Sequence, residues 1–477
     1  MDFDYMIRKL KEECGVFGIY SRDENIDVIN ETYHALYALQ HRGQESCGMA
    51  VNDKGVIVHH KDAGLLPDVF NGVLMDHLRG GQMALGHVRY ASLGDAGREN
   101  AQPLVTKYVK GTIALGHNGS LTNGAELREQ LEYNGAIFQT TNDSEVMCYL
   151  IAKERLRSGS IEEAILRMMY RIQGAYSLVI MSPRKMIAVR DPNGFRPLCM
   201  GKIGDSVVFA SESCALDTLG ATFVRDIEPG EVVVVDENGE RSLKYDIKQK
   251  DGLCIFEYIY FARPDSVIDG ASVHAARQEA GKYLAIEHPV EADLVCGVPD
   301  SGLDAALGYS KESGIPYGTA LIKNRYIGRT FIQPTQKQRE NSVKIKLNPI
   351  KAAIDGKRII LVDDSIVRGT TSAKIIQLLR DNGAKEVHLR ISSPPFLHPC
   401  YFGTDVDSRE NLIACNLTQE QIRAQIGVDT LGYLSLENTK KIPVGCKRDF
   451  CMGCFTGEYP IEIPEQIPQS PFLQKIL

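Results

Sequence analysis

The sequence of 477 residues contains no apolar run near the roughly 18 residues that a membrane-spanning helix requires. Its first thirteen residues, MDFDYMIRKLKEE, carry acidic side chains and lack an apolar core, so they do not form a secretory signal. There is also no internal repeat and no low-complexity tract. These absences predict a cytoplasmic globular protein with no membrane partner.

The sequence also lacks an excess of positively charged residues. The chain has 54 Lys and Arg against 61 Asp and Glu, a net charge of −7, which argues against nucleic acid as a partner. Its 12 cysteines, without an export signal, indicate reduced thiols, catalysis or metal binding rather than a disulfide framework. The length exceeds the size at which a single core keeps growing, so we expect two domains.

Residues 358–372, RIILVDDSIVRGTTS, are the most informative stretch. The apolar run at 359–362 is typical of a strand buried on both faces of a parallel sheet. Asp363 and Asp364 follow it, then a Gly/Thr loop and a helical pattern that stops at Gly383. This order favours a sugar phosphate, because carboxylates bind a diol or Mg²⁺ and a helix N-terminus binds an anion. The alternative is an ordinary helix cap and turn.

The string VDDSIVRGTTS resembles the phosphoribosylpyrophosphate (PRPP) motif of the type I phosphoribosyltransferases, and it does not match a GxxxxGK[ST] phosphate loop. The resemblance implies that Asp363 and Asp364 bind the ribose hydroxyls, directly or with Mg²⁺. It also implies a 5′-phosphate cradle made of Arg368, Gly369, Thr370, Thr371 and Ser372. The loop PDSG, at 299–302, resembles the family's pyrophosphate loop and implies Ser301 near the metal-bound pyrophosphate; alone, it is a common turn.

Five short motifs mark the first half of the chain. They are CGVFGIY at 14–20, HRGQES at 41–46, LGHVRY at 85–90, GHNG at 116–119 and TNDSE at 141–145. Taken singly each is weak, since a buried cysteine is more often part of a core and HNG is more often a turn. In this order and spacing they resemble the glutaminase domain of the class II amidotransferases, whose nucleophile is the N-terminal residue.

That resemblance assigns roles to the residues of these motifs. Cys14 attacks the side-chain amide of glutamine with its own α-amine as the base, and Asn118 and Gly119 form the oxyanion hole. Arg89 holds the substrate α-carboxylate and Asp143 its α-ammonium, with Arg42 supporting the pocket.

Cys14 is internal in the chain as written, so its nitrogen is an amide and cannot act as a base. We therefore expect residues 1–13 to be a propeptide removed by self-cleavage, as in some members of the resembled family. The alternative is a plain N-terminal extension that begins at an earlier start codon.

The second half also contains a candidate metal centre, the pair Cys451 and Cys454 in a CxxC motif. A lone CxxC is redox-active, half of a zinc site or neither, and two more thiolates would complete a zinc Cys₄ site or a [4Fe–4S] cluster. The propeptide-containing branch of the glutamine PRPP amidotransferases carries a structural [4Fe–4S] cluster, and resemblance to it implies Cys254, Cys400, Cys451 and Cys454 as ligands. Cys446 is the rival ligand.

Over nearly all 477 residues the order of motifs resembles the glutamine PRPP amidotransferases. The implied fold is an α+β N-terminal nucleophile αββα sandwich at 14–245, followed by an α/β type I phosphoribosyltransferase domain at 246–477 with a C-terminal cysteine-ligand segment. The implied reaction joins glutamine nitrogen to PRPP, in a homotetramer with purine nucleotide effectors. Residues 323–346, with seven basic residues and one acid, fit a lid over phosphates.

Two other functions are alternatives to this one. An amidotransferase of the glucosamine-6-phosphate synthase type would need a sugar-isomerase domain and has no use for VDDSIVRGTT. A non-catalytic regulatory protein on the same two folds would not need Cys14, Asn118, Asp363 and Asp364 together.

Overall fold

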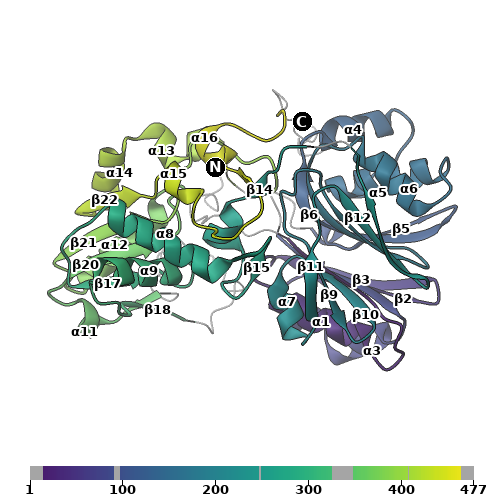
Figure 1. Ribbon diagram of the computed structural model, residues 1–477, viewed down its shortest axis with the longest axis horizontal. Coiled ribbons are helices and arrows are strands. Elements are labelled where there is room, and N and C mark those ends of the chain that lie inside the picture. The colour runs from purple at the N-terminus through teal and green to yellow at the C-terminus, as the bar shows by residue number, and fades with distance from the viewer. Residues whose placement is uncertain are drawn as a thin grey trace, which may run out of the picture.

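The computed structural model describes residues 14–90, 97–246, 249–324, 347–404, 406 and 408–463. Within these ranges the chain forms two lobes that lie side by side, with the first half on the right of Figure 1 and most of the second half on the left. The expected propeptide at 1–13 and residues 325–346 of the expected lid lie outside the described residues. None of the described helices has the length and apolar character needed to cross a membrane.

Two stacked antiparallel sheets build the first lobe. One has the strand order β11-β9-β10-β1-β4-β2-β3 and the other β13-β12-β8-β7-β6-β5. The strands of the first sheet are β1 (Gly15–Tyr20), β2 (Ser46–Asp53), β3 (Val56–Ala63), β4 (Met83–Arg89), β9 (Cys199–Ile203), β10 (Ser206–Ala210) and β11 (Thr222–Asp226). Those of the second are β5 (Leu104–Tyr108), β6 (Gly111–Leu121), β7 (Gly174–Met181), β8 (Met186–Arg190), β12 (Glu231–Asp236) and β13 (Gly239–Lys244).

Helices cover the outer face of each sheet, so the lobe has four layers (Figure 1). The first sheet packs against α1 (Val28–Ala38), α2 (Leu66–Val69), α3 (Gly72–Leu78) and α7 (Ser213–Thr218). The second packs against α4 (Gly124–Glu132), α5 (Asp143–Arg155) and α6 (Ile161–Met169). A third apolar cluster fills the space between the sheets. The predicted αββα sandwich is confirmed.

The strand β1 begins at Gly15, one residue after Cys14, and all six of its residues are buried. Its central position explains this, because it has a strand on either side, a helical layer on one face and the second sheet on the other.

A parallel sheet of order β17-β20-β21-β22 forms the centre of the second lobe. Its strands are β17 (Leu294–Gly297), β20 (Arg358–Asp363), β21 (Glu386–Ile391) and β22 (Thr430–Tyr433). On one face lie α8 (Val273–Glu287) and α9 (Leu303–Ser313), and on the other α12 (Thr370–Asp381) and α14 (Gln419–Ile426). This is the predicted α/β phosphoribosyltransferase architecture.

The helix α12 starts at Thr370, earlier than the apolar periodicity predicted. Thr370, Thr371 and Ser372 therefore form its first turn, and Gly369 precedes them with a left-handed φ of 77°. Hydrophobic spacing cannot detect a polar first turn, because its side chains do not contribute to the core stripe.

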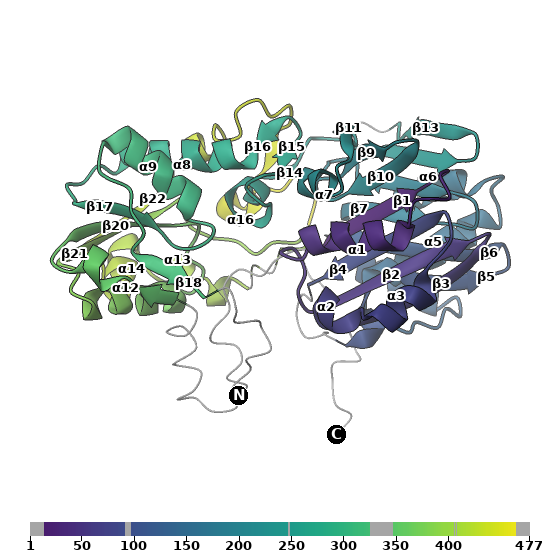
Figure 2. The same ribbon diagram turned by 90° about the horizontal axis from the view of Figure 1, so that it is seen from below.

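Shorter elements complete the second lobe. They are β14 (Leu253–Cys254), the π-helix η3 (Glu257–Phe261), β15 (Val267–Ile268), β16 (Ala271–Ser272), β18 (Leu321–Lys323), β19 (Leu347–Pro349), α11 (Lys351–Ile354), η4 (Arg409–Asn411), α13 (Ile413–Asn416), α15 (Leu436–Thr439), β23 (Phe450–Cys451) and α16 (Gly453–Thr456). The strand β14 pairs in parallel with β23, so the C-terminal part of the chain returns to the junction of the lobes, as Figure 2 shows.

Candidate active sites and cysteine centre

Cys14 stands directly before β1, at one end of the first sheet. Because Gly15 pairs with Val88 of the antiparallel strand β4, the end of β4 at Arg89 lies beside the start of β1. The Cys14 thiol points to the carbonyl oxygen of Tyr90 at 3.8 Å. Sheet pairing thus brings the predicted nucleophile and the predicted carboxylate-binding arginine together.

Asn118 and Gly119 lie on β6 of the second sheet. The Asn118 side chain is only 1% exposed, and both its amide oxygen and its amide nitrogen are buried without a hydrogen-bond partner. A buried unpartnered amide costs about 1–3 kcal/mol per group unless a ligand satisfies it. Gly119 has a φ of 133°, and a Cβ there would lie 2.2 Å from the carbonyl oxygen of Ala175. Only glycine fits at this position, which leaves its backbone exposed to a ligand.

Asp143 is the first residue of α5, after Asn142 caps that helix through the Ser144 N–H. One carboxylate oxygen of Asp143 accepts a hydrogen bond from the Leu121 N–H at 2.7 Å, and the other is 3.7 Å from Nδ1 of His117. Burial lowers the pKa of His117, so this ring is neutral and leaves the negative charge of Asp143 uncompensated by it.

Arg42 lies behind Cys14 and is fully buried. Its Nε donates to the carbonyl oxygen of Cys14 at 3.1 Å, and its terminal nitrogens donate to Glu212 at 2.6 Å and to Glu257 at 2.8 and 2.9 Å. Burial raises the pKa of Glu212, but the charges of His41 and Arg42 outweigh burial and hold that pKa well below its usual range. Arg42 therefore fixes the backbone of Cys14, the predicted nucleophile.

Sequence reasoning missed Glu257 altogether. This residue belongs to the second lobe, in η3, and yet it binds Arg42 of the first. It also lies 3.4 Å from Arg196, another fully buried guanidinium of the first lobe. The available signal was a single acid inside the apolar run 255–261, IFEYIYF, where an unpaired charge would be costly.

A loop of the second lobe reaches the predicted oxyanion hole. A Cβ on Gly403, whose φ is 112°, would lie 3.2 Å from the carbonyl carbon of Gly119. The neighbouring Phe402 ring stacks on Phe195 with centroids 4.0 Å apart, and its carbonyl oxygen accepts from Arg196 at 2.8 Å. The two lobes thus meet at the predicted oxyanion hole.

The second candidate site is a pocket at the carboxyl end of β20. It is lined by Tyr260 and by the continuous run 363–372, which includes every residue predicted to bind the ribose or the 5′-phosphate. Asp363 and Asp364 are only 4% and 5% exposed, so both acids of this lining are buried. The first turn of α12 supplies backbone N–H groups at the same place. Tyr260 was not predicted, because a tyrosine in an apolar run looks like a core residue.

Ser301 meets this acidic pair from the neighbouring strand. Its hydroxyl donates to one carboxylate oxygen of Asp364 at 2.5 Å, and the hydroxyl of Ser365 donates to the other at 2.5 Å. The approach depends on Gly302, where a Cβ would lie 2.2 Å from the carbonyl oxygen of Val362. Asp300 pairs instead with Lys323 at 2.6 Å.

Four cysteines gather at the junction of the lobes. Cys254 and Cys451 are direct partners in the β14–β23 pair. Burial raises the pKa of the Cys454 thiol well above its usual range, and the nearby thiols of Cys400, Cys254 and Cys451 raise it further. Within the described residues, no three such side chains converge closely enough to hold a single metal ion.

Cys446, the rival ligand, contacts a tyrosine. Its sulfur accepts a hydrogen bond from the Tyr258 hydroxyl at 3.5 Å, and burial raises its pKa. It packs against the same apolar cluster as Cys254, Cys400 and Cys454. Cys415 likewise donates its thiol hydrogen to the carbonyl oxygen of Leu397 at 3.2 Å.

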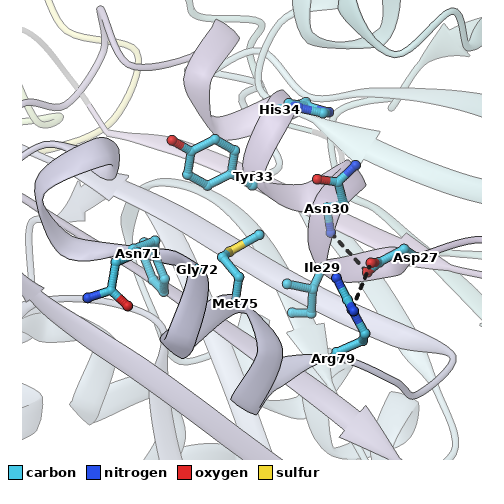
Figure 3. Close-up of a pocket in the computed structure, with 10 residues that line it drawn as sticks. Asp27, Ile29, Asn30, Tyr33, His34, Asn71, Gly72, Met75 and Arg79 are labelled. Carbon is cyan, nitrogen blue, oxygen red and sulfur yellow. Dashed lines mark hydrogen bonds and ion pairs between the residues drawn. The ribbon is translucent and has the colours of Figure 1, made fainter.

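A separate surface pocket of about 260 Å³ lies between α1 and α3 (Figure 3). The ion pair of Asp27 and Arg79, 3.6 Å apart, spans one side of it, and Tyr33 and Met75 line its middle. None of its lining residues belongs to the predicted motifs.

The buried Arg42 network predicts a stability effect. We expect Arg42→Gln to lower the free energy of unfolding by about 3–5 kcal/mol, because it removes the cation that Glu212 and Glu257 share in the interior. His41 then remains beside Glu212, and Arg196, at 3.4 Å, beside Glu257. Since the pKa of Glu212 is depressed in the folded protein, Arg42 contributes its full stabilisation above about pH 4.3 and less as the pH falls below it. Urea unfolding at several pH values measures both effects.

Arg79→Gln is the matched control, because Arg79 is 67% exposed and pairs only at the surface. We expect it to change stability by less than about 1 kcal/mol. A similar small effect from Arg42→Gln would contradict the importance of the buried network.

Comparison with known proteins covers both lobes. A glutamine amidotransferase domain model matches residues 87–218, and a phosphoribosyl transferase domain model matches residues 274–392. The amidophosphoribosyltransferase of Bacillus subtilis is 48% identical over 465 residues, with 96% of each chain covered. That of Methanocaldococcus jannaschii is 49% identical, covering 94% of this chain and 98% of the relative.

Solved structures agree over the same length. A glutamine PRPP amidotransferase from Bacillus subtilis, complexed with ADP and GMP, has a TM-score of 0.87 at 47% identity and covers 95% of this chain and 98% of that one. A structure described as the allosteric regulatory enzyme of purine biosynthesis has a TM-score of 0.90 at 47% identity, covering 97% and 100%. On these grounds the chain belongs to the amidophosphoribosyltransferase family of enzymes.

Proposed function

We propose that this enzyme converts PRPP, glutamine and water to 5-phosphoribosylamine, glutamate and pyrophosphate, the first committed step of purine synthesis. The observation that carries the proposal is the coexistence in one chain of two sites. The first has a thiol at the start of β1 and, on the sheet stacked against it, a buried amide without a hydrogen-bond partner; the second has a carboxylate pair at a strand end beside a helix N-terminus. The second half is a phosphoribosyltransferase domain, which leaves no place for the sugar-isomerase alternative.

In the first site, the Cys14 sulfur attacks the side-chain amide carbon of glutamine. The oxyanion that forms accepts hydrogen bonds from the Asn118 amide, whose donors are otherwise unsatisfied, and from the Gly119 N–H. The tetrahedral intermediate expels ammonia and leaves a thioester, which water hydrolyses to glutamate. Arg89 and Asp143 bind the α-carboxylate and the α-ammonium, so the substrate is fixed at both charged groups.

The base in this reaction is the α-amine of Cys14, which exists only when the preceding peptide bond has been cut. We infer that residues 1–13 are a propeptide and that the glutaminase domain proper begins at Cys14 and extends to about residue 245, where β13 has just ended. The transferase domain with its cysteine segment follows.

In the second site, Asp363 and Asp364 accept hydrogen bonds from the two ribose hydroxyls of PRPP. The run Arg368, Gly369, Thr370, Thr371 and Ser372 binds the 5′-phosphate through the first turn of α12. Ammonia from the first site attacks C1 of the ribose as pyrophosphate leaves. The dry pocket and fixed donors supply positioning and charge stabilisation rather than covalent chemistry.

The oxygen donors of this site suit Mg²⁺, a hard cation that prefers carboxylates and hydroxyls. Asp363, Asp364 and Ser301 would hold it, and when bound it would neutralise charge on the departing pyrophosphate. The Ser301 contact to Asp364 supports this set, because it joins the two loops at one point.

The four clustered cysteines suit a structural [4Fe–4S] cluster. A zinc ion would need four sulfurs about 2.3 Å from one point. A cubane cluster instead binds each thiolate to a different iron, so the ligands surround it without converging on one ion. Cys254, Cys400, Cys451 and Cys454 would hold the cluster, because the thiols of Cys400, Cys254 and Cys451 act on that of Cys454, whereas the sulfur of Cys446 accepts a hydrogen bond from Tyr258.

We further propose a homotetramer regulated by purine nucleotides. The support for the effectors is that the similar Bacillus subtilis enzyme was solved with ADP and GMP. The tetramer remains a prediction from the family resemblance.

The proposal assigns glutamine hydrolysis to the first site and phosphoribosyl transfer to the second, and this assignment is its main test. We expect Asp363→Asn with Asp364→Asn to lower phosphoribosylamine formation by at least about a hundredfold, because the ribose loses its charged acceptors. Glutamate release without PRPP should persist. Asp381→Asn, an exposed change at the end of α12, is the control. Equal loss of both activities in a folded double variant would oppose the assignment.

The mature N-terminus tests the propeptide. Intact mass spectrometry of active enzyme should give a chain that starts at Cys14, because only then is the amine free to act. The variant Cys14→Ala should retain residues 1–13 if cleavage is autocatalytic. Active enzyme that keeps those residues would refute the proposed base.

Metal analysis tests the cysteine centre. Protein purified without oxygen should be brown and contain about four iron atoms per chain. We expect Cys454→Ser and Cys400→Ser to lose iron, while Cys446→Ser and Cys415→Ser retain it. Stoichiometric zinc in a colourless protein, or iron loss in Cys446→Ser alone, would overturn the ligand set.

A further inference from the structure

Lys61, on the edge strand β3, faces the space between the two sheets of the first lobe. It pairs with Gly48 of β2, which pairs in turn with His87 of β4, so the three residues share one face. That face is the inner one, because the His87 ring contacts the carbonyl oxygen of His117 on β6 at 2.9 Å. Figure 2 shows β2 and β3 side by side in this sheet. A lysine is uncommon in such a position.

The ammonium of Lys61 binds backbone rather than a carboxylate. It donates to the carbonyl oxygen of Ala101 at 2.6 Å and to that of Glu99 at 3.2 Å. Burial and, to a smaller extent, the charge of Arg89 lower the pKa of Lys61 to about 8, while the charge of Glu145 acts in the opposite direction. Burying a cation beside a second cation costs free energy, and here the two hydrogen bonds to backbone carbonyls offset that cost.

The segment that Lys61 holds, residues 99–102, lies directly on the sheet. A Cβ on Gly48 would be 2.4 Å from the carbonyl oxygen of Gln102 and 2.6 Å from Cβ of Lys61. The missing side chain at Gly48 therefore makes room for the segment, and the Lys61 side chain closes over it. Arg98 adds a tether from the same side, since its Nε donates to the carbonyl oxygen of Lys61 at 3.3 Å.

The same segment touches both halves of the predicted glutamine site. The side-chain oxygen of Gln102 accepts from the His117 N–H at 2.8 Å, one residue before Asn118. The Asn100 side chain exchanges two hydrogen bonds with Thr141, at 3.1 and 3.2 Å, just before the α5 N-terminus where Asp143 stands. One short segment thus sets the distance between the oxyanion hole and the α-ammonium site.

We propose that Lys61 is a positioning residue of the glutamine site: its ammonium fixes residues 99–102, and these residues hold Asn118 and Asp143 in register for the substrate. The inference rests on the proposed glutaminase function of that site. Lys61 does not touch glutamine in this account. Its effect should appear in glutamine binding and should leave the transferase site untouched.

The test compares two nitrogen donors in one enzyme. Lys61→Met keeps the aliphatic stem and removes the ammonium, so we expect the KM for glutamine to rise about tenfold or more with a smaller change in kcat. Phosphoribosylamine formation from added ammonium salt should stay within about twofold of the wild type. Lys61→Arg, which keeps a cationic donor, should restore most of the glutamine KM.

Lys107→Met is the matched control, because Lys107 is an exposed lysine on β5 with no recorded ion pair among the described residues. It should leave both activities unchanged. An unchanged glutamine KM in Lys61→Met would overturn the proposal, as would a parallel loss of glutamine- and ammonia-dependent rates. Failure of the proposed function itself would look different, since the wild-type enzyme would then release no glutamate.

Discussion

The buried guanidinium of Arg42 links the two lobes of this enzyme next to Cys14, the proposed nucleophile. Arg42 binds the backbone of Cys14, Glu212 of its own lobe and Glu257 of the other lobe, and the side chains of Arg42, Glu212 and Glu257 are buried. Removing one member leaves the remaining buried charges less well compensated in a low-dielectric interior, which is why such a network resists rearrangement. The position of Cys14 relative to β1 therefore depends on the docking of the second lobe.

Both sites use strand ends, but in different ways. In the first lobe, antiparallel pairing sets the start of β1 beside the end of β4, so residues distant in sequence meet at one sheet edge. In the second, the parallel sheet gathers the ends of β17 and β20 on one side, where Ser301 meets Asp364. In the proposed function this topology determines the chemistry: the amino acid would be bound at its two charged ends, and the phosphorylated sugar beside a helix N-terminus.

Much of this organisation could be predicted from the sequence, because short contiguous motifs encode it. The strand with its acidic pair, the phosphate loop and the two sheet layers each have local patterns, and the predicted folds are confirmed. What escaped prediction depends on distant partners. Tyr260 and Lys61 carry no local signal, since their importance comes from residues that fold beside them. Glu257 stands out locally only as a lone acid in an apolar run, and the run does not indicate Arg42 as its partner.

The pairing of β14 with β23 has a consequence for the order of assembly during translation. Strand β14 leaves the ribosome soon after the first lobe, while its partner lies near the C-terminal end of the chain. The two-sheet sandwich can form early, but Cys254 cannot meet Cys451 and Cys454 until these residues have been synthesised. Nascent chains that end before Cys451 consequently lack the β14–β23 pair, whereas the contact of Arg42 with Glu257 needs only the residues up to 257.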